Sequence, residues 1–537
     1  MKRIVYICLF LMIGMFAYAQ QLKKGLYVGD TFKEEMDLSD ALDWITSNAK
    51  NEGEYTIVLD GEIASPSNVL DYGGKKVNIH LTTTDTISST VTYVTRSPSS
   101  SLFTIKKNVT FVLEGGVSLK GLETASRPPV TVDGGIFIME SGSVEHSNVE
   151  IPNWFGGGVD VLHGGTFIIN GGIVYSNCSS AGAGVNVGEN CTLIMNGGAI
   201  CDNIAHEKGN IKRGLGFGGG VFVDKNATFT MNGGRISGNY AGVGNDYGGG
   251  NGVYVNGVFT MVDGQIFGNG NFGKGAVCVS GNGIFTMKAG CIRDHWCPAV
   301  YIDINVKGAL NLHVPSIISG AENGKFIMEG GEIYSNKGWG VCGNGIFEMN
   351  NGSIHNNHGG VSIQKGAFTM NAGEISKNSH IGVELRISTF IMNEGLISEN
   401  VNSEKDADAG GVYIGERSIF TMNNGVISNN SANNGGGVYV SSGGQFFMND
   451  GVISGNKAKV SGGGVYVSMY EVTGSIGDFI KSNTGGIIYG GEVSGDKANK
   501  SGKYGHAVYT VNGSKDATAK ATKGLDSRKQ GAEGGWE

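Results

Sequence analysis

The feature that most constrains this chain is a repeated unit. Residues 409–456 hold two consecutive copies of the pattern GGVYV…F-x-M-N-x-G-x-I-S-x-N, and twelve copies can be traced between residues 137 and 456. Such internal periodicity indicates a repeat architecture rather than a set of separate domains, despite the length of 537 residues. The aromatic position of the copies is occupied by Phe137, Phe167, Leu193, Phe229, Phe259, Phe285, Phe326, Phe347, Phe368, Phe390, Phe420 and Phe446.

Positions at fixed distances from this Phe define the local structure of each copy. A Met follows two residues later in eleven of twelve copies, a Gly five residues later in all twelve, and Ile or Val seven residues later in all twelve. An Asn stands ten residues later in ten of twelve copies, and a V-x-V-like triplet precedes most of the Phe residues. Because the apolar positions alternate with period two, each copy is predicted to form three short strands separated by Gly and Asn turns.

The spacing of the copies selects the architecture. The shortest steps are 21, 21 and 22 residues, from Phe326 to Phe347, Phe368 and Phe390. A unit this short cannot bury its apolar side alone, so successive copies must stack, each strand pairing in parallel with its equivalent one coil later. We therefore predict an all-β parallel β-helix with Phe, Met, Val and Ile in the lumen and Asn ladders at the turns. About fifteen coils would give a rod of roughly 70 Å.

The two ends of the chain differ from the repeats. Residues 1–19 have the pattern of a signal peptide, with Lys2 and Arg3 before an apolar run and cleavage expected between Ala19 and Gln20. We assign residues 20–101 to an N-terminal cap, in which residues 38–45 form a short amphipathic helix with Ser39 or Asp40 as N-cap. Residues 102–515 form the β-helix, and residues 516–537 form a polar tail or cap.

Charge and cysteine content exclude some classes of function. The net charge of −8 is scattered and forms no basic stripe, so nucleic acid is not an expected partner. No apolar run after the signal peptide is long enough for a transmembrane helix.

Seven of the eight Cys follow the signal peptide and none forms a C-x-x-C motif, so we expect free or half-buried thiols. Cys291 and Cys297 are close enough in sequence to leave a disulfide open as an alternative.

These repeats resemble those of a known group of proteins. Gly437 to Tyr439 and the Phe-x-x-Asn segments at Phe229 and Phe420 are similar to the paired short motifs GGAI and FxxN of the chlamydial polymorphic outer membrane proteins. More generally, residues 130–515 resemble the secreted right-handed parallel β-helix proteins of bacteria. The resemblance implies a right-handed, pectin-lyase-like fold and a location outside the cell or at its outer surface.

Pectate lyases and polygalacturonases share this architecture, so catalysis has to be considered, although fold alone does not imply it. The middle residues of the V-x-V triplets, taken as the outward positions, never place two acids on neighbouring coils. Paired carboxylates for hydrolysis are therefore not expected there, and we predict no catalytic residue, metal or cofactor. Two segments depart from the repeat. One is Arg293 to Trp296, and the other is an acidic loop with Glu404, Asp406 and Asp408. The carboxylate oxygens of this loop are suitable ligands for calcium, but a loop of solvated charges is the simpler interpretation.

Two sets of aromatic residues are the candidate binding residues. Tyrosines recur at the same outward position of three successive coils, and two tryptophans precede successive strands with a tyrosine between them in sequence. Rows of exposed rings suit the apolar faces of sugars, but they also stabilise β-sheets without any ligand. The candidates for carbohydrate binding are Tyr413, Tyr439, Tyr466, Trp296, Tyr301 and Trp339.

The sequence therefore favours an exported, non-catalytic β-helix scaffold acting in adhesion or glycan binding, with a polysaccharide or a host or microbial surface glycan as partner. A polysaccharide lyase or glycoside hydrolase is one alternative. A purely structural surface rod is the other.

Overall fold

The computed structural model describes residues 22–84, 88–94, 99–123, 126–149, 156–206, 216–242, 248–270, 273–303, 324–404 and 407–470, and short strand segments between 475 and 536. The predicted signal peptide and almost all of the tail at 516–537 lie outside the described residues.

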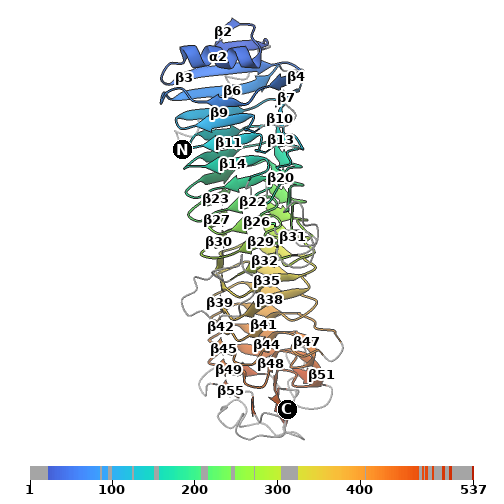
Figure 1. The fold of residues 1–537 in the computed structure, drawn as a ribbon. Helices are drawn as coiled ribbons and strands as arrows, with labels where there is room; N and C mark the ends of the chain where they lie inside the picture. The colour runs from blue at the N-terminus through green and yellow to red at the C-terminus, as the bar shows by residue number, and fades with distance from the viewer. Residues whose placement is uncertain are drawn as a thin grey trace, which may run out of the picture.

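The chain winds into a parallel β-helix, as the repeat spacing predicts (Figure 1). Each coil contributes one strand to each of three parallel sheets, named A, B and C in the order in which the chain enters them. The x-Phe-x-Met segment lies in sheet A, the following x-Ile-Ser segment in sheet B, and the V-x-V triplet in sheet C.

The strands of the three sheets have the following bounds. Sheet A contains β3 (Gly53–Leu59), β6 (Val77–Thr83), β9 (Val109–Leu113), β12 (Ile136–Met139), β15 (Thr166–Ile169), β19 (Thr192–Met195), β23 (Thr228–Met231), β27 (Val258–Met261), β30 (Ile284–Met287), β33 (Lys325–Met328), β36 (Ile346–Met349), β39 (Ala367–Met370), β42 (Thr389–Met392), β45 (Ile419–Met422), β49 (Gln445–Met448) and β55 (Asp478–Lys481). Sheet B contains β4 (Glu62–Ser65), β7 (Ser89–Tyr93), β10 (Val117–Lys120), β13 (Ser143–Glu145), β16 (Ile173–Tyr175), β20 (Ala199–Cys201), β24 (Arg235–Ser237), β28 (Gln265–Phe267), β31 (Cys291–Arg293), β34 (Glu332–Tyr334), β37 (Ser353–His355), β40 (Glu374–Ser376), β43 (Leu396–Ser398), β46 (Val426–Ser428), β50 (Val452–Ser454) and β56 (Ile487–Ile488). Sheet C contains β5 (Asn68–Leu70), β8 (Phe103–Lys106), β11 (Val130–Asp133), β14 (Val159–Leu162), β18 (Val185–Val187), β22 (Val221–Val223), β26 (Val253–Val255), β29 (Val277–Val279), β32 (Val300–Ile302), β35 (Trp339–Gly343), β38 (Gly359–Gln364), β41 (Val383–Arg386), β44 (Val412–Ile414), β48 (Val438–Val440), β52 (Val465–Val467) and β58 (Val508–Thr510), with β59 (Gly535–Trp536) added antiparallel.

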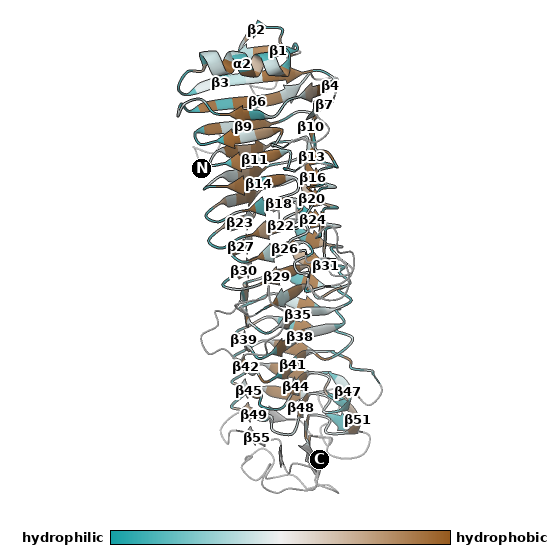
Figure 2. Cartoon of the chain, viewed as in Figure 1, coloured by the Kyte–Doolittle hydropathy of each residue, from teal (hydrophilic) through white to brown (hydrophobic). Residues whose placement is uncertain are grey.

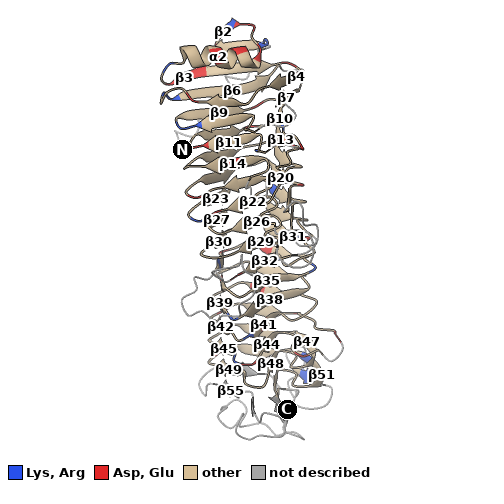
Figure 3. Cartoon of the chain, in the orientation of Figure 1, with Lys and Arg blue, Asp and Glu red and all other residues tan. Residues whose placement is uncertain are grey.

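The lumen is filled by columns of identical side chains. Phe368, Phe390 and Phe420 pair in register along sheet A, are fully buried or nearly so, and stack with ring centroids 4.5 and 4.6 Å apart. The Met residues two positions later form a second buried column beside them. Hydrophobic residues concentrate along the strands (Figure 2), and charged residues are sparse there (Figure 3). The predicted Phe and Met columns are thus confirmed.

A helix and a hairpin close the N-terminal end of the lumen (Figure 1). Helix α2 (Leu38–Asn48) buries Leu38, Ala41, Leu42 and Ile45, and the hairpin of β1 (Gly25–Val28) and β2 (Thr31–Glu34) pairs antiparallel with β3. The prediction of a capping helix is confirmed, but the N-cap is Asp37, not Ser39 or Asp40. Strand β3 already pairs in parallel with β6, so the coils begin at Gly53, within the segment assigned to the cap.

The repeated Gly is required by its left-handed backbone conformation and, in most coils, by the Met of the preceding coil. Gly395 has a φ of +107°, and a Cβ atom at this position would lie 2.6 Å from Cε of Met370 and 2.9 Å from the carbonyl oxygen of Gly373. Both the backbone conformation and the space therefore exclude a side chain. The same Met contact recurs at Gly373, Gly425 and Gly451, whereas Gly142, Gly172 and Gly198 meet backbone atoms of the preceding coil instead. A positive φ is common to all twelve copies and explains why this Gly is present in each.

We expect Gly395→Ala to lower the free energy of unfolding by about 2–3 kcal/mol, because it adds a steric clash to backbone strain. Gly268→Ala is the matched control: its φ is +59°, but no heavy atom lies within 4 Å of the added Cβ. That variant should lose only about 1 kcal/mol. Urea denaturation of both variants measures the difference, and equal losses would contradict the packing role of the Met column.

Candidate functional site

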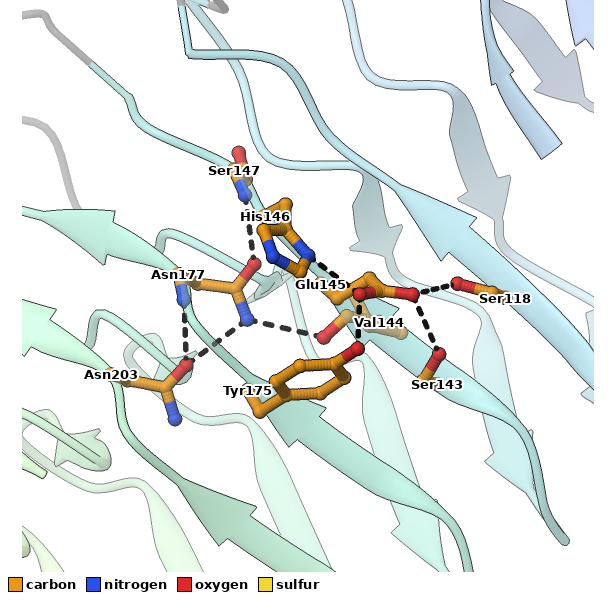
Figure 4. A network of polar contacts seen from close by, with 9 residues as sticks. All are labelled: Ser118, Ser143, Val144, Glu145, His146, Ser147, Tyr175, Asn177 and Asn203. Carbon is orange, nitrogen blue, oxygen red and sulfur yellow. Dashed lines mark hydrogen bonds and ion pairs between the residues drawn. The ribbon is translucent and has the colours of Figure 1, made fainter. Parts of the chain in front are cut away.

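A buried asparagine ladder forms the spine of the corner between sheets B and C. The Oδ1 atom of Asn357 accepts hydrogen bonds from the backbone N–H of Asn336 at 3.1 Å and from its Nδ2 at 2.8 Å. The Nδ2 of Asn357 donates in turn to the carbonyl oxygen of Ile333 at 3.0 Å. The ladder begins at Asn177, which accepts from the N–H of Ser147 (Figure 4). The predicted Asn ladder is confirmed, and it runs inside the wall rather than on its surface.

The residue before each ladder position is in the left-handed backbone region. In four successive coils this residue is Asp294, Ser335, Asn356 or Lys377, with φ values of 60°, 57°, 54° and 55°. The chain therefore turns sharply around each buried ladder residue. The residues on both sides of that ladder residue come to the surface of the corner.

These flanking residues line a groove with a volume of about 760 Å³ that extends over four coils. At one end Trp296 is 67 % exposed, and Lys337, His358 and Ser379 succeed it at the equivalent position of the next three coils. The groove is lined by Asp294, Trp296, Ser335, Asn336, Lys337, Asn356, Asn357, His358, Lys377 and Ser379.

The position of the groove follows from the lengths of the corners between sheets B and C. Extra strands extend this corner in earlier coils, as β17 (Cys178–Ser179), β21 (Ile204–Ala205) and β25 (Tyr240–Ala241), and in later coils, as β47 (Ser431–Asn434), β51 (Lys457–Ser461) and β57 (Lys500–Ser501). The fully described corners that follow β31, β34, β37 and β40 carry no such strand. The groove thus lies where the corner between sheets B and C is short, in the three shortest coils from Phe326 to Phe390 and in the coil before them.

The groove has an excess of positive charge. Asp294 is paired with Arg293, whose guanidinium also lies 4.6 Å from the centroid of the Phe267 ring. Lys337 and Lys377 have no ion pair within the described part of the chain. The two ammonium groups are therefore available to an acidic ligand.

His295 replaces asparagine in the ladder directly beneath Trp296. Its Nδ1 accepts from the N–H of Asn269 at 3.0 Å, and its Nε2 donates to the carbonyl oxygen of Ile266 at 3.2 Å. These hydrogen bonds require a neutral ring with its proton on Nε2. Nδ1 then takes the role of the amide oxygen as acceptor, and Nε2 takes the role of the amide nitrogen as donor. Burial lowers the pKa of His295 to about 4.

Replacement of this histidine should alter the pH dependence of stability. Between about pH 6.5 and 4 the unfolded chain binds a proton that native His295 does not, so the native state loses up to roughly 3 kcal/mol as the pH falls through this range. Above pH 6.5 the contribution of His295 is complete. His295→Asn should remove this part of the acid destabilisation, which urea titrations at pH 7.5 and 4.5 would measure. His358→Asn, at an exposed position, should behave like the wild type; if it does not, the effect is not specific to the ladder.

The aromatic residues predicted as candidates occupy three different environments. Trp296 lies in the groove. Trp339 packs edge-on against His380 at 5.6 Å and belongs to an apolar cluster with Ile381, Ala409, Tyr413, Tyr439 and Tyr466. Tyr301 lies apart from both, under the Nζ atom of Lys274 at 5.5 Å.

The three tyrosines form a continuous stack along sheet C. The ring centroids of Tyr413 and Tyr439 are 5.5 Å apart, those of Tyr439 and Tyr466 are 5.0 Å apart, and the ring planes differ by less than 10°. Tyr439 is only 9 % exposed. Because the ring faces contact each other, only the ring edges remain for a ligand, and the tyrosines contribute chiefly to packing.

A cluster of charged residues that the sequence reasoning missed lies on sheet C near the N-terminal end. Asp133 accepts from Lys106 and from Nδ1 of His163 at 2.5 Å, while buried Asp160 accepts from Nδ2 of Asn186 at 2.7 Å. Burial raises the pKa of Asp160 to about 6, whereas Lys106 and His163 hold the pKa of Asp133 below its usual value. Only the middle residue of each V-x-V triplet was considered, so Asp133, at the end of β11, was overlooked.

A third carboxylate, that of Glu145 on sheet B, is held by four donors (Figure 4). Glu145 accepts from Ser118, Ser143, His146 and Tyr175, and these hydrogen bonds keep the pKa of this partly buried carboxylate low. Its lone pairs are used by the protein, so we assign it a structural role.

The remaining sequence candidates lie outside any site. The seven cysteines among the described residues are free thiols, and burial raises the pKa of Cys297 to about 12, which makes it unreactive. In the acidic loop, Glu404 lies 3.8 Å from His380 and Asp408 accepts from Asn434, while Asp406 lies outside the described residues. Within the described part of the chain, no group of three or more His, Cys, Asp or Glu side chains could hold a metal ion. No described helix has the length and apolar character needed to cross a membrane.

Comparison with protein-family models, with curated proteins and with solved structures finds no match to this chain. The class of protein that the fold defines is a parallel β-solenoid.

Proposed function

We propose that this protein is an exported, non-catalytic β-helix scaffold that binds an extended glycan along the groove between Asp294 and Ser379. The observation that carries the proposal is the repetition of surface side chains along four coils. Coils are spaced by about 4.8 Å, close to the length of one sugar unit in a polysaccharide. A chain that lies along the rod would thus meet one aromatic or polar side chain at the equivalent position of each coil, from Trp296 to Ser379.

The chemistry of the groove suits a carbohydrate. Trp296 offers an exposed ring face for stacking on a sugar, and the Ser and Asn side chains can exchange hydrogen bonds with hydroxyl groups. Lys337 and Lys377 favour a glycan that carries carboxylate or sulfate groups.

We expect Trp296→Ala to weaken retention on a bound polysaccharide about three- to tenfold, because one stacked ring contributes roughly 0.5–1.5 kcal/mol. The measurement is affinity electrophoresis of the mature chain through gels that contain neutral, uronic-acid or sulfated polysaccharides. Tyr439→Ser is the informative comparison. It should lower the unfolding midpoint, since the ring is packed, while retention by the folded fraction stays the same.

The double variant Lys337→Gln/Lys377→Gln should lose retention on acidic polysaccharides only, and added salt should weaken wild-type binding to the same polymers. Lys365→Gln removes one exposed lysine at the corner between sheets C and A, and it serves as the control for the single variants Lys337→Gln and Lys377→Gln. Equal losses in the Lys365 control and in the groove variants would exclude the groove as the binding site.

A polysaccharide-cleaving enzyme is the second candidate, and Asp133 and Asp160 favour it. Two carboxylates whose pKa values are shifted in opposite directions are typical of an acid and base pair. The same assays therefore include measurement of new reducing or unsaturated ends. Release of such ends that is abolished by Asp160→Asn would replace the binding proposal with an enzymatic one.

A further inference from the structure

The outer face of sheet A is a long array of β-branched side chains. In each strand from β12 to β49, the residues before and after the buried Phe point outward, because side chains alternate along a strand. The first of these two columns consists of Ile136, Thr166, Thr192, Thr228, Val258, Ile284, Lys325, Ile346, Ala367, Thr389, Ile419 and Gln445. The second consists of Ile138, Ile168, Ile194, Thr230, Thr260, Thr286, Ile327, Glu348, Thr369, Ile391, Thr421 and Phe447.

The large apolar members of this face are unusually exposed. Ile284, Ile346 and Ile391 are 37 %, 37 % and 40 % exposed, and Ile136, Val258 and Ile419 are exposed to a similar extent. The outer face of sheet C differs, since Phe222, Glu384 and Tyr439 at its equivalent positions are buried. Twelve of the 24 residues in the two columns are Ile, Val, Ala or Phe, and nine are Thr, whose methyl groups add apolar area. Such a surface along twelve coils is larger than isolated apolar residues explain.

The face carries almost no charge. Lys325 and Glu348 are the charged residues in the two columns, and their side chains form an ion pair of 2.9 Å on adjacent strands. Lys325 holds the pKa of Glu348 below its ordinary value, so this pair stays ionised and neutral overall near neutral pH. Partners that are recognised by charge are therefore disfavoured.

The face is also regular. Each strand pairs with the next in parallel and in the same register from β12 to β49, without a bulge. Sheet A runs along one side of a straight rod (Figure 1). Columns of side chains with a constant spacing form ridges and grooves. The same face of a second copy has the same spacing and can fit them along its whole length.

We propose that a second copy of this chain docks on the outer face of sheet A, so that two rods pack face to face through the same surface. Twelve strands at about 4.8 Å, with roughly 13 Å of strand length each, offer on the order of 750 Å² per protomer. The total of about 1,500 Å² is the size of a standard stable interface. A surface that pairs with itself gives a closed two-fold dimer, and sheet-on-sheet packing is a common way to bury such faces.

The dimer leaves the groove accessible, because the groove lies at the corner between sheets B and C. The proposal is independent of what the groove binds. It predicts two parallel or antiparallel grooves in one assembly, which would strengthen the retention of a long polymer through multivalency.

Sedimentation velocity of the mature chain over a range of concentrations tests the dimer. We expect a monomer–dimer equilibrium that persists in high salt, since apolar burial is not screened. The double variant Val258→Lys/Ile419→Lys should raise the dimer dissociation constant by roughly 100-fold or more, because each dimer would bury unpaired charges. Both positions are exposed in the protomer and have uncharged neighbours in register on the adjacent strands, so the coil itself tolerates lysine.

Ser237→Lys/Ser428→Lys is the control, which adds the same two charges to well-separated strands on the outer face of sheet B. It should dimerise like the wild type. A wild-type chain that stays monomeric at its highest soluble concentration, a dimer that dissociates in high salt, or a dimer that both lysine pairs weaken equally would each overturn the proposal. Circular dichroism melting curves confirm that the variants are folded.

Discussion

The structure depends on the in-register stacking of like side chains from one coil to the next. A coil of 21 or 22 residues has no core of its own, and it becomes stable only when its apolar residues contact those of its neighbours. The Phe column shows how strict this requirement is, since rings such as Phe390 and Phe420 lie nearly parallel, with planes 7° apart. Register is therefore shared along the rod, and a shift in one coil would misplace every column at once.

The asparagine ladder serves the same constraint with polar groups. A sharp corner leaves backbone groups without strand partners, and burial without hydrogen bonds would be costly. Each ladder amide satisfies backbone groups of the preceding coil, as Asn357 does for the N–H of Asn336 and the carbonyl oxygen of Ile333. His295 shows that the requirement concerns donors and acceptors rather than the amide itself, since a neutral imidazole fills the same role at the cost of sensitivity to acid.

Function is left to the surfaces that this framework does not use. Four coils with short corners expose a groove between sheets B and C, whereas sheet A exposes a neutral array of Ile, Val and Thr. The two surfaces differ in chemistry and lie on different sides of the rod. A scaffold that binds a long polymer with one surface and pairs through another is consistent with both, and neither surface needs catalytic chemistry.

The candidate site was only partly predictable from the sequence. Trp296 was identified because it interrupts the repeat, and the structure places it in the groove. Lys337, His358 and Lys377 carried no signal, because variable polar residues at a turn look the same whether or not they line a groove. The tyrosine row was found by its register, but its burial depends on the strands of neighbouring coils and on stacking between rings. Asp133 was missed because it lies one position beyond the triplet that defines the repeat.

The sequence by itself determined the coil, its three strands, the Phe and Met columns and the Asn ladder, because these features arise from local periodicity and from the need of each copy to pair with an identical neighbour. The tertiary structure alone decided where the coils begin, which outward residues are covered, and where short corners leave a groove between longer ones. Whether an outward side chain is exposed, and which other side chains lie near it, depends on the way in which many coils stack. The repeat pattern does not constrain these variable residues.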